Sequence, residues 1–474
     1  MKLNAHNFKE NAKKALKDDD LQASLQKLGT GFPLKRLAAM DRLPEFEDLR
    51  DQARDIKDHT LRHLDFYLEQ FESRVVETGG KVHWARDIKD GRKIVYEICE
   101  AVGAKTVTKG KSMIGEEMAI NEYLEEKGLI PIETDLGEYI IQLRNEPPSH
   151  IIAPAIHLRK SHVEEAFRKT HTELPKDRNL DAPEDLLVEA RTMLRKKFIA
   201  ADVGITGANF MVAETGSTVI VTNEGNGDLT QTLPRVHIVL CSIEKVVPTL
   251  EDCTTLLRVL ARSATGQEQS VYTTFSTGPR GETDPDGPDE FHVVILDNGR
   301  SRMLGHDTHD MLRCIRCSAC INHCPVYQSV GGHAYGSIYP GPMGSVLTPA
   351  LHGLEKSCDL PNASTMCGKC EEVCPVRIPI PKMLRSWRKK QWEDGPVPTL
   401  QRLAMNWWAW WALRPKLYHK VAGWKMRIMG FMCRKSGHIK ALPIKNGWTE
   451  NRDFPAPEGK TFQQRWSEKG GRRT

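Results

Sequence analysis

Eight of the chain's twelve cysteines lie between residues 314 and 374, and their spacing constrains the fold more than any other feature. The first block has the spacing C-x2-C-x2-C-x3-C-P and contains Cys314, Cys317, Cys320 and Cys324. The second block is looser, also ends in Cys-Pro, and contains Cys358, Cys367, Cys370 and Cys374. A loop with two-residue gaps can direct three thiolates at one point, and the proline fixes φ where the loop ends.

The first block has the spacing of bacterial-type ferredoxins, in which three thiolates hold one [4Fe–4S] cluster and the fourth belongs to the other cluster. We therefore predict two [4Fe–4S] clusters. The predicted ligands of cluster one are Cys314, Cys317, Cys320 and Cys374. Those of cluster two are Cys324, Cys358, Cys367 and Cys370. Cys358 departs from the pattern because it lies nine residues before Cys367, so it would reach the cluster from a longer loop.

Zinc sites and disulfides are the alternatives for this many cysteines. Zinc ribbons usually pair two C-x2-C motifs across a longer gap and do not need a triple run that ends in Cys-Pro. Structural disulfides form in exporting compartments. The chain starts Met-Lys-Leu-Asn-Ala-His without an apolar stretch typical of a secretory signal. The pattern therefore favours clusters over both alternatives.

The overall composition is that of an ordinary soluble protein with more than one domain. The chain has 474 residues, of which 39% are hydrophobic and 27% charged. Its net charge of +5 is mild and does not indicate a nucleic-acid partner. No run of 18 apolar residues predicts a membrane-spanning helix. Together with cluster-forming thiolates, these features predict a cytoplasmic location.

The first two thirds of the chain alternate between helical and strand patterns. Residues 1–44 read as an N-terminal arm with short helices, and residues 45–304 as an α/β domain. Within this domain we expect one helix over residues 45–76 that ends at Gly79-Gly80. Further helices are expected through Ile94, Ile98 and Val102, after a cap at Ser112, and over residues 181–200 and 250–264. Strands are expected over residues 81–85, 105–108, 150–156, 236–241 and 291–297, which predicts a three-layer α/β fold with a largely parallel sheet.

A glycine-rich stretch from Gly204 to Gly227 contains two predicted strands, Phe210–Ala213 and Ser217–Thr222, joined by a turn at Thr215-Gly216. The glycines do not have the spacing of a dinucleotide-binding fingerprint. Two interpretations stay open: turns at a β-rich edge, or a ligand-binding lip. Glu214 is the only acid at the first turn, and we assign it no catalytic role. The cysteines outside the two blocks are predicted core thiols: Cys99, Cys241, Cys253 and Cys433.

The last third divides into a cysteine-containing domain over residues 305–392 and a tryptophan-rich helical region with a polar tail over residues 393–474. Residues 331–344 look too rich in Gly and Pro for a helix, and a loop there suits a partner or substrate surface. Four tryptophans fall within five residues: Trp407, Trp408, Trp410 and Trp411. This helix suits a partner, the clusters, a membrane interface or packing on the protein's own domains.

Taken together, these features resemble the LutB family, the iron–sulfur subunit of the lactate-utilisation system. The resemblance is carried by the two Cys-Pro blocks, the Trp-rich C-terminal region and three short stretches, Asp135–Ile140, Pro148–Pro154 and Ala213–Gly216. It implies an α/β domain related to the ribose-phosphate isomerase and CoA-transferase fold, fused to a two-cluster ferredoxin module. It also implies a complex that oxidises L-lactate to pyruvate and contains a cysteine-rich subunit and a second α/β subunit.

We therefore predict an electron-transfer subunit of an L-lactate dehydrogenase complex, in contact with the membrane surface at most peripherally. No flavin or nicotinamide fingerprint is present, and no catalytic residue can be assigned. One alternative is the iron–sulfur subunit of a dehydrogenase for another 2-hydroxy acid or for glycerol 3-phosphate. Another is a redox-sensing protein whose clusters report oxidation state.

Overall fold

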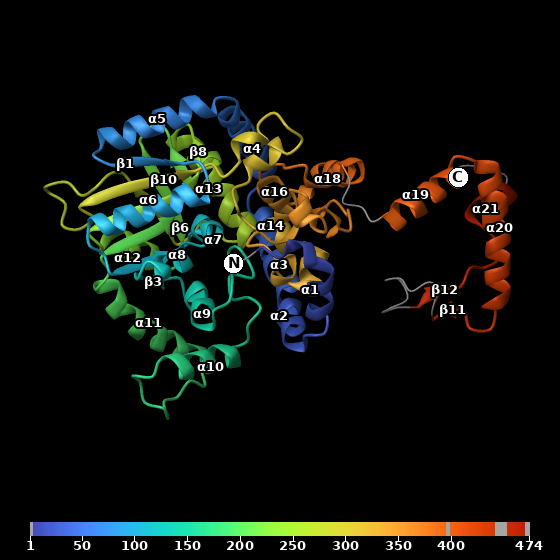
Figure 1. The fold of residues 1–474 in the computed structure, drawn as a ribbon, viewed down its shortest axis with the longest axis horizontal. Coiled ribbons are helices and arrows are strands. Elements are labelled where there is room, and N and C mark those ends of the chain that lie inside the picture. Colours follow the sequence, from blue (N-terminus) through green and yellow to red (C-terminus); the bar gives the residue numbers. More distant parts are fainter. Residues whose placement is uncertain (1–2, 395–398, 441–452, 470–474) are drawn as a thin grey trace. The chain divides into compact units, whose positions relative to one another are not determined.

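The computed structural model describes residues 3–394, 399–440 and 453–469. The chain forms two compact units, Met1–Asp394 and Gly395–Thr474 (Figure 1). The first unit contains the α/β region together with both cysteine blocks.

The core of the first unit is a six-stranded sheet in which all neighbouring strands are parallel. Its strands, in spatial order, are β1 (Lys81–Ala85), β10 (Glu290–Leu296), β7 (Val236–Ser242), β4 (Val203–Gly207), β2 (Thr106–Gly110) and β3 (Ile130–Glu133). Every residue of β7 and β4 is buried, as expected for central parallel strands covered on both faces. The predicted α/β class with a parallel sheet is confirmed.

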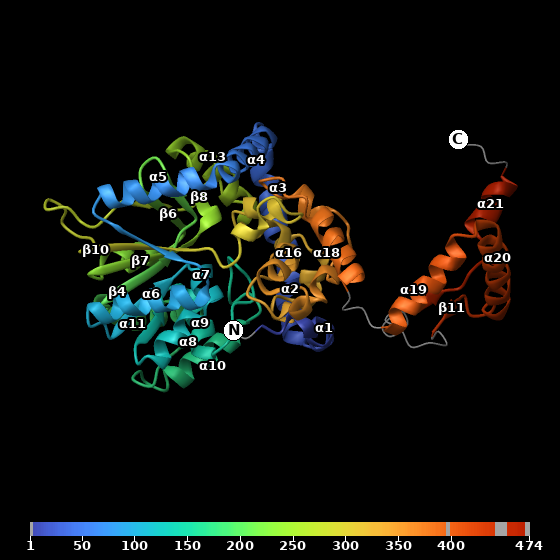
Figure 2. The ribbon, with the colours of Figure 1, turned by 45° about the horizontal axis from the view of Figure 1, so that its top comes forward.

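Helices cover the two faces of this sheet. Helix α5 (Leu64–Glu77) packs on the face that contains Val239 and Val293. Helix α6 (Ile88–Ala101) packs on the opposite face, beside Ile238 and Val294 (Figure 2). Between β2 and β4 the chain forms helices α7 (Met113–Met118), α8 (Ile120–Glu126), α9 (Leu136–Arg144), α10 (Lys160–Thr170) and α11 (Pro183–Ile199). Ser112 caps α7 as predicted, accepting a hydrogen bond from the Gly115 N–H.

A second, four-stranded sheet was not anticipated as a separate layer. Its strands, in spatial order, are β8 (Val246–Val247), β5 (Phe210–Val212), β6 (Ser217–Thr222) and β9 (Tyr272–Ser276). The predicted hairpin of β5 and β6 is confirmed, and Gly216 adopts a φ of +70° in its turn. Helix α13 (Leu250–Ala264) was predicted with the same bounds. Helix α12 (Asn226–Thr232) begins at the end of the glycine-rich stretch and was not predicted.

The N-terminal arm forms the predicted short helices, and these pack on the cysteine-containing segment. They are α1 (Phe8–Ala15), α2 (Asp19–Thr30) and α3 (Phe32–Asp41). Helix α2 contacts α15 (Pro325–Val330), and α3 contacts α14 (Ala319–Asn322). The long helix expected over residues 45–76 is instead two helices, because His63 leaves helical geometry between α4 (Phe46–Arg62) and α5.

Two expectations for apolar or glycine-rich segments were wrong. Residues 150–156 form bends and turns instead of a strand, and the edge strand is β3. Pro148 and Pro154 remove two N–H donors, and the segment is apolar because it is covered by the cysteine-containing segment. The Ser149 carbonyl accepts a hydrogen bond from the Tyr327 hydroxyl at 2.9 Å. Residues 331–344 are mostly buried, and their end belongs to α16 (Gly341–His352).

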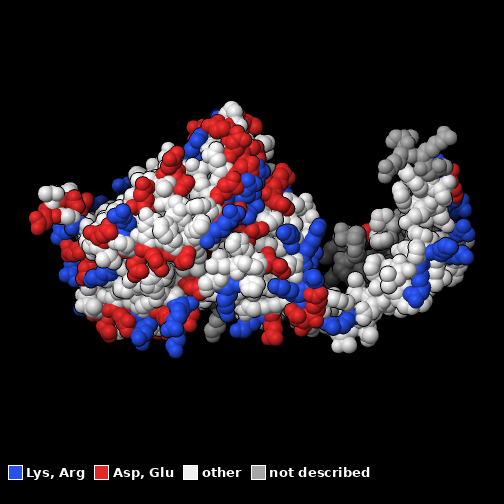
Figure 3. Space-filling model, turned by 90° about the horizontal axis from the view of Figure 1, so that it is seen from above, with Lys and Arg blue, Asp and Glu red and all other residues white. Residues whose placement is uncertain are grey.

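The cysteine blocks form two short helices, α14 and α17 (Lys369–Glu372), flanked by α16 and α18 (Ile380–Asp394). The second unit contains α19 (Thr399–Ala412), α20 (Pro415–Met432), α21 (Phe462–Glu468) and the strand pair β11 (His438–Ile439) and β12 (Phe454–Pro455). Trp407 on α19 is 62% exposed. In the described part of the chain, no helix is long and apolar enough to cross a membrane. Figure 3 shows basic and acidic side chains interspersed over the visible face of the first unit.

Candidate functional site

The two cysteine loops have the same backbone conformation, offset by 50 residues. In the first loop, the residues on both sides of Cys317, Arg316 and Ser318, have φ values of +61° and +63°. In the second loop, Met366 and Gly368 on both sides of Cys367 have φ values of +57° and +84°. Such left-handed residues turn the chain so that the following short helix presents its cysteine toward the loop. The repeat was visible in the sequence as equal spacing but was not recognised there.

This repeat pairs residues of the two loops one by one. Cys317, Cys320 and Cys324 correspond to Cys367, Cys370 and Cys374. Cys314 corresponds to Ser364, not to Cys358. The Ser364 hydroxyl accepts a hydrogen bond from the Met366 N–H at 3.1 Å.

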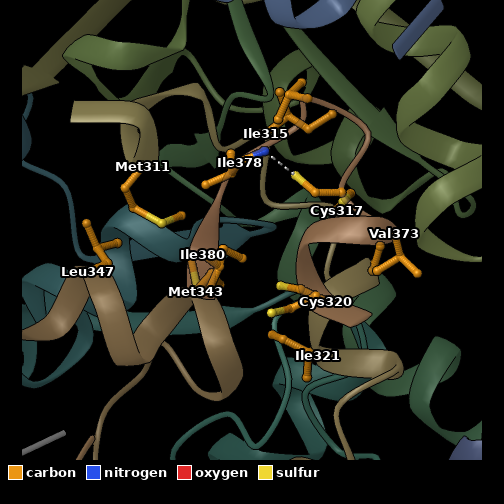
Figure 4. Close-up of a cluster of buried hydrophobic side chains, with 14 of the residues drawn as sticks. Met311, Ile315, Cys317, Cys320, Ile321, Met343, Leu347, Val373, Ile378 and Ile380 are labelled. Atoms are coloured by element: carbon orange, nitrogen blue, oxygen red, sulfur yellow. Dashed lines mark hydrogen bonds between the residues drawn. The ribbon is translucent and has the colours of Figure 1, made fainter. Parts of the chain in front are cut away.

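The structure brings the four predicted ligands of cluster one together. Cys314, Cys317, Cys320 and Cys374 line one small cavity of about 20 Å³. Its other walls are mainly apolar and include Ile151. Met311, Met343, Ile378 and Ile380 also line it (Figure 4). Four thiols that converge on one apolar cavity are the donor set that a [4Fe–4S] cluster requires.

Burial dominates the electrostatics of this cavity. Burial, with Cys374 as the largest neighbouring charge, raises the pKa of Cys317 to about 12. Burial also raises the pKa of Cys374 to about 11, although backbone N–H groups oppose the shift. One of these is the Ile378 N–H, which donates to the Cys374 Sγ at 3.4 Å. Such thiols need a positive centre to become thiolates, and iron supplies one.

Three of the four ligands predicted for cluster two also lie together. Burial, followed by the neighbouring Cys324 and Cys367, raises the pKa of Cys370 to about 12. Cys367 is exposed, and hydrogen bonds from the Lys369 N–H and the Thr365 side chain lower its pKa. The strongest electrostatic neighbours of the fourth, Cys358, are Asp359 and Lys9 instead of cysteines. Its role as a ligand stays a prediction.

Tyr335 is close to cysteines of both sets and was missed by sequence reasoning. Its side chain is fully buried, and burial followed by the neighbouring Cys324 raises its pKa well above the ordinary value. Cys320 of the other set also contributes to this shift. Among the residues that the structure describes, none forms a hydrogen bond of good geometry with its hydroxyl. Tyr335 is therefore available as a donor to the Cys324 sulfur.

A buried ionic network connects the α/β region to the first loop. The guanidinium group of Arg300, which is 0% exposed, contacts Glu117 of α7 at 2.6 Å and Glu244 at 3.1 Å. Glu244 also contacts Arg316 at 3.1 Å, and the Tyr339 hydroxyl donates to Glu117 at 2.6 Å. Burial disfavours the charged form of Glu244, but Arg300 and Arg316 outweigh it and lower its pKa to about 2.

A larger cavity of about 200 Å³ lies directly beside the first loop. On one side it is lined by Lys111, Gly207 and Ser242, which follow or end β2, β4 and β7. On the other side it is lined by Arg316 and Cys317. Asn209, Thr222 and Asn223 of the glycine-rich stretch also line it, which favours the ligand-binding lip among the two interpretations. Glu214 is elsewhere: its carboxylate accepts a hydrogen bond from the Leu250 N–H.

The remaining side chains of interest are the cysteines outside the two blocks and the histidine pair His59 and His63. All twelve cysteines are free, and Cys99, Cys241 and Cys253 are buried as predicted, whereas Cys433 is half-buried. The rings of His59 and His63 lie 4.9 Å apart, and His59 contacts the Tyr67 hydroxyl at 2.8 Å. Among the described residues, no three His, Cys, Asp or Glu side chains are arranged to hold a metal ion. A four-iron cluster spreads its sulfur ligands more widely than one ion does.

Family models match most of the chain. Residues 68–296 match the LUD domain, residues 310–378 match the 4Fe-4S dicluster domain, and residues 390–471 match the C-terminal domain of lactate utilisation protein B. The dicluster match, the free cysteines and their cavity agree, so the cofactors are two [4Fe–4S] clusters.

Curated relatives match over nearly the whole length. Lactate utilization protein B of Bacillus velezensis is 42% identical over 465 residues, which cover 98% of this chain and 97% of that protein. Lactate utilization protein B of Bacillus subtilis (strain 168) is 41% identical over 470 residues, covering 98% and 96%. A crystal structure of a DUF162 family protein from Deinococcus radiodurans covers 49% of this chain and 98% of its own, with 13% identity and a TM-score of 0.28. From the family models and the full-length relatives, the chain belongs to the lactate utilization protein B family.

Proposed function

We propose that this chain is the iron–sulfur electron-transfer subunit of a complex that oxidises L-lactate to pyruvate. The observation that carries the proposal is the convergence of Cys314, Cys317, Cys320 and Cys374 on one buried cavity. Relatives that are 41–43% identical over nearly the full length bear the name lactate utilization protein B, which supports lactate as the fuel.

The residues around the first loop create a dry, positively charged site for a negatively charged cofactor. Met311, Met343 and Ile380 exclude water from it. Lys57 is fully buried and lies near Cys314. Burial lowers the pKa of its ammonium group to about 8, and the carboxylate of Glu244 partly opposes this shift. A [4Fe–4S] cluster, when bound, exchanges one electron at a time, so two clusters match the two electrons that a 2-hydroxy acid releases.

We propose Cys314, Cys317, Cys320 and Cys374 as the ligands of cluster one. For cluster two we propose Cys324, Cys367 and Cys370, which the repeat relates to the ligands of the first loop. The sequence pattern offered Cys358 as the fourth ligand, whereas the repeat has Ser364 at the position of Cys314. The structural neighbours of Cys358 favour the repeat.

The partners we propose are a cysteine-rich subunit and a second α/β subunit, with the complex in the cytoplasm. Residues 45–304 form the proposed α/β domain, 305–392 the two-cluster domain and 393–474 the C-terminal domain. The exposed aromatic side chains of α19 and α20 support a docking role for the C-terminal domain, toward a partner or the membrane surface.

The test is cluster reduction by substrate in the anaerobically purified chain mixed with its partner subunits. We expect the electron paramagnetic resonance (EPR) signals produced by dithionite to appear also with L-lactate. Glycolate and glycerol 3-phosphate serve as parallel substrates. If glycolate or glycerol 3-phosphate reduces the clusters and lactate does not, that compound and not lactate is the substrate. If none of the three reduces the clusters, redox sensing is favoured over electron transfer.

A further inference from the structure

We propose that the 200 Å³ cavity beside the first cysteine loop is a binding site for a small monocarboxylate of the 2-hydroxy or 2-oxo acid class. The choice of acid rests on the proposed function, whereas the site itself rests on geometry. Its defining groups are the buried Lys245 and the largely buried Arg316, two cationic side chains that line one cavity from different parts of the chain.

The cavity lies where the winding of the parallel sheet reverses. From β2 the chain continues outward to β3, whereas from β4 it continues in the opposite direction to β7 and β10. The reversal therefore falls between β2 and β4, and the residues at their carboxyl ends, Lys111 and Gly207, line the cavity. In open α/β sheets, ligands bind outside the carboxyl ends of the strands at such a point.

Two cationic side chains of the cavity have hydrogen-bond donors that the described residues leave without an acceptor. The side chain of Lys245 is 7% exposed and forms no hydrogen bond or salt bridge with a residue that the structure describes. The Nη1 atom of Arg316 is buried without a hydrogen-bond partner, although its Nη2 contacts Glu244. Glu244 is already shared between Arg300 and Arg316. A buried cation without a partner is costly, and an anion in the cavity would remove that cost.

The acidic residues that line the cavity do not supply this anion. Asp135 pairs with Lys111 and caps α9. Glu138 accepts a hydrogen bond from the Lys111 N–H, and burial, with the nearby Glu133 and Asp135, raises its pKa well above the ordinary value. This shift favours the uncharged form of Glu138, which does not repel a carboxylate.

The size and walls of the cavity fit a small acid. Pockets for drug-sized ligands have volumes of about 300–1,000 Å³, whereas this cavity measures about 200 Å³. Apolar side chains line much of it, including Met113, Ile114, Leu240 and Leu260. An apolar wall strengthens a charge–charge contact because it lowers the local dielectric constant. Cys317, a proposed ligand of cluster one, lines the same cavity, so the acid would bind beside that cluster.

The two cations have a second possible role, which is to offset the negative charge of cluster one. The two roles predict different effects of changes that leave the charges in place. Ala261 of α13 lines the cavity without a charge, and Ala261→Leu would fill space there. This variant should block an acid but leave the charge around the cluster unchanged.

The experiment is anaerobic calorimetric titration of the cluster-loaded full chain with pyruvate, which binds without being oxidised. We expect saturable binding that weakens roughly 10- to 100-fold in Lys245→Met, because a charge-assisted contact is lost. Ala261→Leu should abolish binding, and the exposed Lys89→Met should bind like the unchanged protein. The iron content of each variant verifies that its clusters are loaded. If Lys245→Met loses iron, pyruvate binding by Ala261→Leu decides whether the cavity is the binding site.

Several outcomes would overturn the site. The first is that pyruvate shows no saturable binding. The second is that neither Lys245→Met nor Ala261→Leu changes pyruvate binding. The third is that inorganic phosphate binds as tightly as pyruvate. Lactate-dependent cluster reduction in the complex separates this inference from the proposed function. Lactate-dependent reduction in a protein that shows no saturable pyruvate binding removes the site and keeps the function. Pyruvate binding without any reduction by lactate keeps the site and removes the function.

Discussion

The two cysteine loops share one backbone conformation but differ in their surroundings and in one residue. The first is covered by the α/β region, has Cys314 at its start and adjoins the large cavity. The second has Ser364 at the equivalent position and presents an exposed Cys367. Local spacing fixes the shape of a cluster loop, whereas its burial and its complete ligand set depend on what the rest of the chain contributes.

This difference between the two loops indicates a direction of electron transfer through the chain. A buried site beside a cavity suits the entry of electrons from a substrate, and a more exposed site suits their exit to a partner. We therefore expect cluster one to lie on the substrate side and cluster two on the acceptor side. Each of the following predictions tests one part of the comparison.

The largest expected effect is the loss of one cluster at a time. Cys317→Ser should remove cluster one and lower the iron content from about eight to about four atoms per chain, because a four-iron cluster needs its thiolates. Cys367→Ser should remove cluster two and leave the signal of cluster one. Iron quantitation and EPR after dithionite measure both effects, and Cys433→Ser is the control. Loss of both clusters in either variant would contradict two independent sites.

The buried network should matter more for the first loop than for the second. Arg300→Met removes the cation shared by Glu117 and Glu244, and breaking such a buried pair typically costs about 3–5 kcal/mol. We expect a lower unfolding free energy and a weakened cluster-one signal in denaturant titrations. The exposed Arg302→Met provides the control. Equal stability of the two variants would show that the network does not support the loop.

Tyr335→Phe should change the reduction potential of cluster two with little effect on stability. The hydroxyl next to Cys324 stabilises extra negative charge on the sulfur, so its removal should lower that potential. One net hydrogen bond of about 0.5–1.5 kcal/mol corresponds to roughly 20–60 mV for one electron. Redox titration followed by EPR resolves the two clusters. An equal shift of cluster one would show that Tyr335 does not act through Cys324.

The smallest expected effect is that of Cys358→Ser. Because Asp359 and Lys9 are its strongest neighbours, we expect unchanged iron content and unchanged signals from both clusters. Ser364→Cys is the matched variant, since it gives the second loop a cysteine at the position that corresponds to Cys314 in the first loop. It should alter the signal of cluster two. Iron loss in Cys358→Ser would instead identify this cysteine as the fourth ligand of cluster two.

Local patterns were predictable from the sequence, whereas long-range ones were not. Helix α13 follows from local periodicity and has the predicted bounds. The four cysteines assigned to cluster one line one cavity, and their role as its ligands stays a prediction. Residues 150–156 were mistaken for a strand because they pack against residues far away in sequence, such as Tyr327, whose ring lies 5.5 Å from that of His150. The large cavity combines Lys111, Lys245 and Arg316, which no local pattern connects. The counterpart of Cys314 was missed because Ser364 does not stand out in a search for cysteines.

The account depends most directly on two clusters in one chain. Anaerobic purification with iron and sulfide quantitation, followed by EPR of the dithionite-reduced protein, measures this. We predict about eight irons per chain and signals from two magnetically interacting clusters. About four irons in the unchanged protein, with a single non-interacting signal, would contradict the two-loop arrangement.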